Sequence, residues 1–169
     1  MHVERMPDEA FDRFAMTPVV IRPFDPASKR AALTYGERLN DRLRPTGVAA
    51  ELFGSVALEI AGKGEWEFAL YPSDAQWYPT LIALINHYRG VYTMSDEFVL
   101  FEDECDGHSI EVIVMRGGTA ERNRAIMRYW HEHPDALAFY EAEKYRHCHA
   151  KREYYRWKEH FIADILEAL

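Results

Sequence analysis

The sequence predicts an α+β fold in which a small mixed or mostly antiparallel sheet with helices is followed by a C-terminal helical tail. Strand-like and helical segments both occur up to Gly118, which favours a mixed architecture. The dipeptide Asp106-Gly107 lies between two alternating apolar runs and predicts a β-hairpin, because both central residues of a type I′ turn need positive φ. After Gly118 only helical periodicity remains.

Length and composition indicate one globular domain. We expect it to span residues 1–169, with an α/β part at 18–118 and helices at 119–169. Apolar residues make up 48% and charged residues 28%, as in folded rather than disordered chains. No apolar run approaches the roughly 20 residues of a membrane helix, and the N-terminal stretch lacks the apolar block of a secretory signal. Two cysteines cannot form a disulfide framework, so we expect a cytoplasmic location.

The formal net charge of −8 is unevenly distributed. The whole acidic excess precedes Thr119 and is densest between Glu51 and Glu111. This balance argues against long-range attraction to nucleic acid or to an anionic membrane. The acidic stretch is either a solvated face or a divalent-cation site, because hard cations bind carboxylate oxygens.

The first third of the chain predicts two helices and an extended segment between them. Residues 6–15 form a weak helix candidate, and residues 17–26 contain three prolines and should be extended. Ser28–Arg44 has leucines near the helical period and ends before Pro45.

The next segment predicts strand, loop, strand and helix. Alternation predicts a strand from Val48 to Gly54, a loop at 55–64, and a strand at 65–71. A helix capped by Asp74 and running to Tyr88 should bury one apolar stripe. The stripe contains Leu81, Leu84 and Ile85.

The predicted hairpin pairs residues 98–105 with residues 108–115. Alternation places Ile110 on one face of the second strand and Glu111 on the other. The acidic residues around this hairpin lack calcium-loop spacing, so we expect a solvated tip. They are Asp96, Glu97, Glu102, Asp103, Glu104 and Asp106.

The tail predicts three helices, at residues 121–132, at 134–148 with Pro134 in the first turn, and at 151–169. Its Tyr and Trp residues at helical spacing predict core packing rather than a base-stacking platform. Its two His-rich triplets, at 131–133 and 147–149, have no zinc-ligand spacing and predict polar helix surface.

The stretch with the clearest chemistry is Leu52-Phe53-Gly54-Ser55, which nine intervening residues separate from Glu65-Trp66-Glu67. Gly54 lets the backbone approach a phosphate, and the Ser55 hydroxyl can bind its oxygens. Glu65 and Glu67 lie two residues apart on a strand and share a face, where they could hold Mg²⁺. A third carboxylate, Glu111, lies on a later strand.

Plainer interpretations of the same residues stay open. Glu65 and Glu67 could line a solvent-facing strand, as antiparallel sheets often show, and Glu111 could be surface. Lys63 could neutralise a phosphate or be an exposed loop lysine.

The turn, the spacer and the paired carboxylates resemble the signature of the nucleotidyltransferase superfamily. A narrower resemblance is to the GrpB family, from about Val20 to the C-terminus. It is carried by Ile21-Arg22-Pro23-Phe24-Asp25-Pro26, by Lys63-Gly64-Glu65-Trp66-Glu67, by His133-Pro134, and by the tail residues Tyr140, Lys144, Tyr155, Lys158, Phe161 and Ile162. In this sequence Glu67 stands where the family has Asp, and Glu111 where it usually has His.

The resemblance implies a nucleotidyltransferase-like fold and a Mg²⁺-dependent transfer of a nucleoside monophosphate from an NTP to an unidentified acceptor. Glu65 and Glu67 would be metal ligands, Glu111 would activate the acceptor hydroxyl, and Gly54, Ser55 and Lys63 would hold the phosphates. The glutamates in place of family residues support an alternative, a catalytically inactive nucleotide-binding or protein-interaction module on the same fold. A third hypothesis is an oligomerisation module that uses the helical tail.

Overall fold

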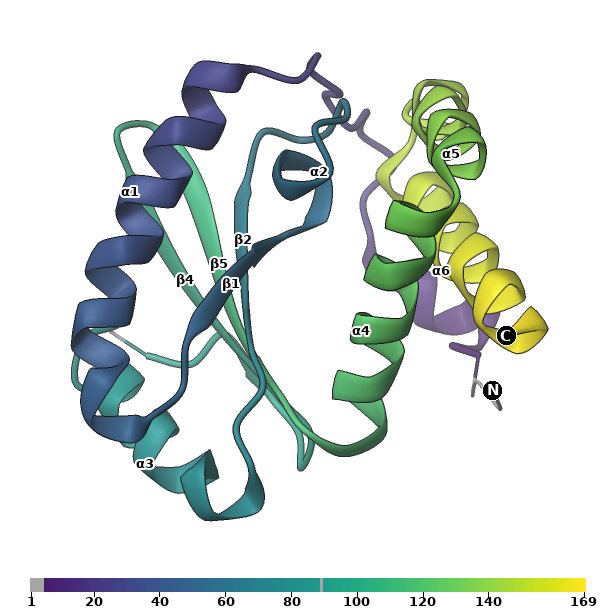
Figure 1. Ribbon diagram of the computed structural model, residues 1–169. Helices are drawn as coiled ribbons and strands as arrows, with labels where there is room; N and C mark the ends of the chain where they lie inside the picture. Colours follow the sequence, from purple (N-terminus) through teal and green to yellow (C-terminus); the bar gives the residue numbers. More distant parts are fainter. Residues whose placement is uncertain (1–4, 89) are drawn as a thin grey trace.

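The computed structural model describes residues 5–88 and 90–169 and has an α+β architecture (Figure 1). In chain order its elements are the 3-10 helix η1 (Asp8–Arg13), α1 (Pro26–Leu43), the 3-10 helix η2 (Arg44–Thr46), β1 (Ala50–Phe53), α2 (Gly54–Ala57), β2 (Trp66–Leu70), α3 (Asp74–Ile85), β3 (Thr93–Met94), β4 (Phe98–Cys105), β5 (His108–Met115), α4 (Gly117–Glu132), α5 (Pro134–His147) and α6 (Lys151–Ala168). The predicted fold class, a small sheet with helices followed by a helical tail, is confirmed.

The described strands form one mixed sheet in the order β1-β2-β5-β4-β3. Three of its pairings are antiparallel, and the pairing of β2 with β5 is parallel. Glu67 of β2 and Glu111 of β5 are partners in that parallel register. Residues opposite each other in register point to the same face, so the two glutamates share a face.

Helices α1 and α3 cover one face of the sheet (Figure 1). The core between them and the strands is continuous and contains alternate residues of β2 and β5, such as Phe68 and Val112. These positions alternate with the glutamates, which therefore lie on the opposite face.

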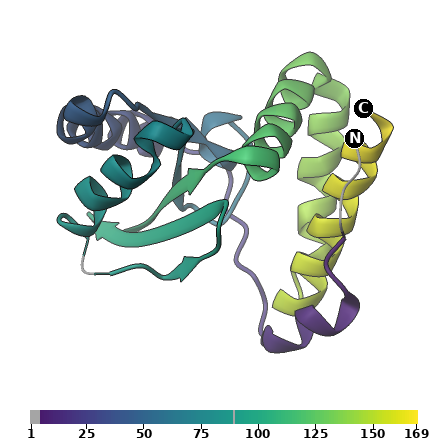
Figure 2. The same cartoon turned by 90° about the horizontal axis from the view of Figure 1, so that it is seen from below.

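Helices α4, α5 and α6 lie beyond β1, β2 and α2 in Figure 1, away from α1 and α3, and Figure 2 shows the same separation. Their own core stacks Trp130 of α4 on Tyr140 of α5 and extends to Phe161 of α6. Ile60, in the loop after α2, is buried in the same cluster and links the helices to the sheet portion. The tail aromatics thus form a core, as predicted.

The N-terminal segment ties the two portions together. Its backbone bonds to the turn between α5 and α6, where Val19 donates to the carbonyl of Cys148 and Lys151 donates to that of Thr17. Further on, Arg22 and Gly62 form an isolated antiparallel bridge. Arg5 contacts α6 through Asp164 and Glu167, beside the end of the chain.

Most of the predicted elements are confirmed within two or three residues. The hairpin matches residue for residue, and its turn has φ values of 52° at Asp106 and 77° at Gly107. Pro134 occupies the first turn of α5. The extended segment before α1 contains no helix in its described residues.

Other predictions were wrong in detail. The segment predicted as a loop after Gly54 begins with the helical turn α2, and the weak helix at 6–15 is the shorter 3-10 helix η1. Ser73, not Asp74, caps α3, because Gln76 reaches back to accept from the Ser73 backbone at 3.1 Å. Ile85 is exposed, since α3 ends there.

One acidic residue near the hairpin is structural rather than freely solvated. Glu97 accepts from the backbone N–H of Thr119 at 3.0 Å and from its hydroxyl at 3.1 Å. It thereby caps the unpaired amides in the first turn of α4, and these hydrogen bonds lower its pKa. No helix within the described part of the chain combines the length and apolarity that crossing a bilayer requires.

Candidate functional site

The strand-to-helix turn between β1 and α2 brings the backbone against a carboxylate. Gly54 has a φ of 69°, which disfavours residues with a Cβ. A Cβ placed there would lie 1.9 Å from Oε2 of Glu67. The positive φ favours glycine at this turn, and the Glu67 carboxylate occupies the space that a Cβ would need.

Gly62 is a second close approach, at the far end of the same loop. A Cβ on Gly62 would lie 2.5 Å from the Cβ of Ser55. The loop thus folds back on the start of α2, and the backbone N–H of Ile60 donates to the carbonyl of Ser55 at 3.1 Å. This holds the Ser55 hydroxyl in a defined position.

The three predicted carboxylates approach one another on the sheet face opposite α1. Glu65 and Glu67 are on that face of β2 and its N-terminal extension, and Glu111 is beside Glu67 on β5. Burial, reinforced by the negative charge of Glu67, raises the pKa of Glu111 to about 7. A carboxyl with such a pKa exchanges a proton near neutral pH.

Lys63 forms an ion pair with one of these carboxylates. Its ammonium group lies 2.5 Å from Oε2 of Glu65 and donates to the Tyr155 hydroxyl of α6 at 3.2 Å. Burial has the largest single effect and lowers the pKa of Lys63, but Glu65 and Tyr155 together outweigh it, so the pKa is raised. The lysine is therefore a partly buried cation and not an exposed loop residue.

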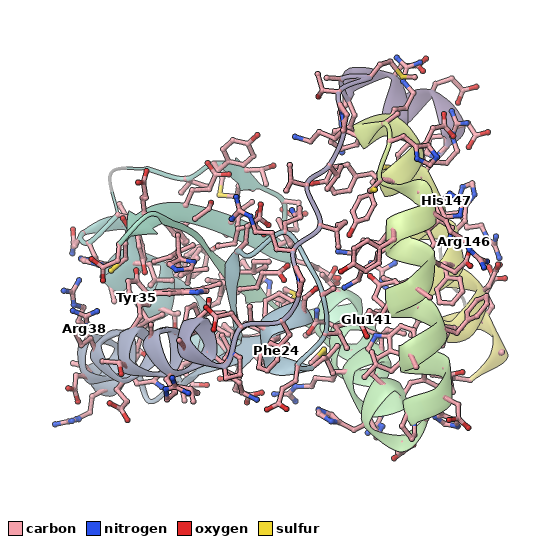
Figure 3. The ribbon with its side chains drawn as sticks, turned by 90° about the horizontal axis from the view of Figure 1, so that it is seen from above. Phe24, Tyr35, Arg38, Glu141, Arg146 and His147 are labelled. Atoms are coloured by element: carbon pink, nitrogen blue, oxygen red, sulfur yellow. The ribbon has the colours of Figure 1, made fainter. Side chains whose placement is uncertain are left out.

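Lys144 of α5 is a buried lysine that the sequence analysis did not place in the site. Its side chain is 1% exposed, and its ammonium group donates to the Ser55 hydroxyl at 2.8 Å and to the carbonyl of Ala61 at 2.7 Å. One turn earlier, Glu141 accepts from the backbone N–H of Ala61 at 2.6 Å. Figure 3 shows Glu141 on the side of α5 that faces the sheet portion. Helix α5 thus clamps both ends of the loop from Ser55 to Ala61.

The environment of Lys144 favours its neutral form. Burial, and next the positive charge of Lys158, lower the pKa of Lys144 to about 7. The amine is then poised between the charged and neutral states at neutral pH, while bonded to a serine hydroxyl.

Lys158 of α6 is the third lysine. It lines the cleft together with Tyr154 and is partly buried. Tyr140 raises its pKa, burial opposes this, and Glu67 raises it further, so the group stays charged at neutral pH. Within residues 5–88 and 90–169, no group forms a hydrogen bond or a close ion pair with this ammonium.

A sequence signal for these two lysines exists. Lys144 follows the buried Tyr140 by four residues, and Lys158 follows the buried Tyr154 by four, so each lies on the inward face of its helix. A lysine at such a position is rarely buried without a partner, and it therefore indicates a polar site beneath the helix.

The predicted residues share one cleft between the start of β2 and α6. Its lining includes Ser55, Lys63, Gly64, Glu65, Glu67, Tyr154 and Lys158. Glu111 adjoins it through Glu67, and Gly54 lies beneath the Glu67 carboxylate. Hydroxyl and ammonium donors facing carboxylates can bind an anionic group and exchange protons with it.

The donor set does not fit the Mg²⁺ predicted from the sequence. Glu65 is already paired with Lys63, and the ammonium of Lys158 lines the same cleft. Across the described residues, no group of three or more His, Cys, Asp or Glu side chains is arranged to hold a metal ion. A divalent ion here would have to displace one ammonium and tolerate the others.

Comparisons with known proteins leave the family open. No protein-family model matches the chain, and no curated protein matches it, so the resemblance to the GrpB family stays a prediction. Among solved structures, the chain is similar to that of a cytoplasmic RNA terminal U-transferase, with 13% identity and a TM-score of 0.41. The match covers 72% of this chain and 37% of that one, so this chain spans little more than a third of that protein's length.

Proposed function

We propose that this chain is a GrpB-type nucleotidyltransferase-like protein that binds the phosphate groups of an NTP in the cleft between β2 and α6. The observation that carries the proposal is the meeting of a Gly-Ser turn with two ammonium groups, Lys63 from the loop before β2 and Lys158 from α6. Ser55 and Lys63 supply a hydroxyl and a cation, and Gly54 lets the backbone approach the ligand.

Thermal or urea unfolding with a panel of NTPs tests this proposal. A nucleotide present at 100 times its Kd should add about 2.7 kcal/mol to the free energy of unfolding. Lys63→Met should weaken this stabilisation because it removes a cation that lines the cleft. Lys151→Met is the matched control, since Lys151 is exposed on α6 and does not line the cleft. If no NTP stabilises the protein, with or without Mg²⁺ or Mn²⁺, the proposal is wrong.

A second candidate function is transfer of the nucleoside monophosphate to an acceptor hydroxyl. The observation that favours it is Glu111, whose pKa of about 7 suits a general base. Pyrophosphate release from NTPs, measured with Mg²⁺ or Mn²⁺ and candidate acceptors, should fall strongly in Glu111→Gln. Nucleotide binding without pyrophosphate release would favour the inactive binding module instead.

A further inference from the structure

Two lysines, Lys63 and Lys158, line the cleft together with the glutamates that the sequence predicts as metal ligands. Lys63 lies 2.5 Å from the Glu65 carboxylate, and Lys158 lines the cleft together with Glu67. Each predicted metal ligand therefore already has an ammonium group beside it or facing it. The pairing is consistent with the absence of a metal-ligand cluster among the residues that the structure describes.

Lys158 carries an unfilled hydrogen-bonding capacity into the cleft. An ammonium group has three donors and no acceptor. For the described residues, none of the three finds a hydrogen-bond acceptor, although the side chain is partly buried and its charge is favoured. A group with these properties binds an anion well, because burial strengthens charge-assisted hydrogen bonds.

Lys63 and Lys144 have hydrogen-bond partners within the protein, whereas the described residues offer none to the ammonium group of Lys158, which lines the cleft. Lys63 has Glu65 and Tyr155 as partners, and Lys144 has Ser55 and Ala61. Of these three lysines, Lys158 alone has no hydrogen-bond or ion-pair partner among the described residues. A ligand in the cleft would supply the missing acceptor.

We propose that the ammonium groups of Lys158 and Lys63 take the place of divalent cations, so that the cleft binds a triphosphate group as the metal-free anion. This inference rests on the proposed function and deepens it by naming the form of the ligand. Complexation by Mg²⁺ neutralises part of the triphosphate charge and brings a cation toward the lysines, so added metal should leave affinity unchanged or weaken it.

Calorimetric titration with ATP and with inorganic tripolyphosphate tests the inference, each in EDTA and in Mg²⁺. Binding in EDTA should be at least as tight as binding in Mg²⁺. Lys158→Met should weaken binding in EDTA by about 10- to 100-fold, the worth of a hydrogen bond to a charged group. Lys158→Arg, which keeps the charge, should recover much of this loss, and Lys151→Met should bind as the wild type does. Circular dichroism confirms that each variant is folded.

Each other outcome decides between the two proposals. Binding that requires Mg²⁺ and is lost in Glu67→Gln overturns the inference and leaves the proposed function standing. Tight binding in EDTA that Lys158→Met leaves unchanged also overturns the inference. Absence of binding under every condition overturns both.

Discussion

Replacing Lys144 by Met should change how the stability of the protein depends on pH. Burial lowers the pKa of Lys144 from an ordinary value of 10.5 to about 7. Between these values the unfolded chain binds more protons than the folded chain, so the free energy of unfolding rises with pH. Raising the pH from 7 to 9 should therefore add about 2 kcal/mol through this residue. Lys144→Met removes that contribution.

Urea unfolding at pH 7, 8 and 9 measures this effect as the difference between wild type and Lys144→Met. The difference should grow in favour of the wild type by about 2 kcal/mol over the range. Lys151→Met controls for other titrating groups, because Lys151 is exposed on α6. Should the wild type and Lys144→Met give parallel curves, Lys144 is charged throughout and the argument from burial fails.

Three further outcomes follow from the structure. Gly54→Ala should lower the free energy of unfolding by at least about 1 kcal/mol, because Gly54 has a positive φ and the Glu67 carboxylate crowds its Cβ position. Gly90→Ala, at a position with no neighbouring atom within 4 Å, should change the free energy of unfolding little. Equal stabilities of the two variants in urea would contradict this prediction. Glu97→Gln should lower the melting temperature at pH 7, because it removes the charge that caps α4. In acid the wild-type carboxylate is protonated and also uncharged, so the two melting temperatures should converge. A difference in melting temperature that does not change with pH would argue against the cap. We also propose that residues 1–169 form a single domain. Circular dichroism and tryptophan fluorescence should then report one unfolding transition with the same midpoint, and two separate midpoints would refute the proposal.

Local sequence signals predicted the elements well. The Asp106-Gly107 turn, Pro134 and the periodic apolar residues of α1 and α6 act within a few residues of themselves, so the chain alone defines those segments. The same alternation placed Glu111 on the face opposite Ile110, and the structure confirms it.

Long-range features were harder to predict. The two-residue strand β3 is too short for a periodic signal, and the parallel pairing of β2 with β5 depends on a crossover through α3 and β4. Lys144 and Lys158 enter the site through helix packing across more than 80 residues, as the bond from Lys144 to Ser55 illustrates. The sequence could not show where the C-terminal helices pack, so the glutamates alone suggested a metal site. In the structure, lysines lie beside these glutamates.

The contact of Arg5 with α6 places the start of the described chain beside its end (Figure 2). Joining the two ends with a short flexible linker and opening the chain in the exposed turn at Asp106 and Gly107 would give a circular permutant that keeps the contacts of the cleft. In such a permutant β5 would come first, and the tail would precede the Gly-Ser turn in the chain. The cleft therefore depends on the spatial meeting of these segments and not on their order along the polypeptide.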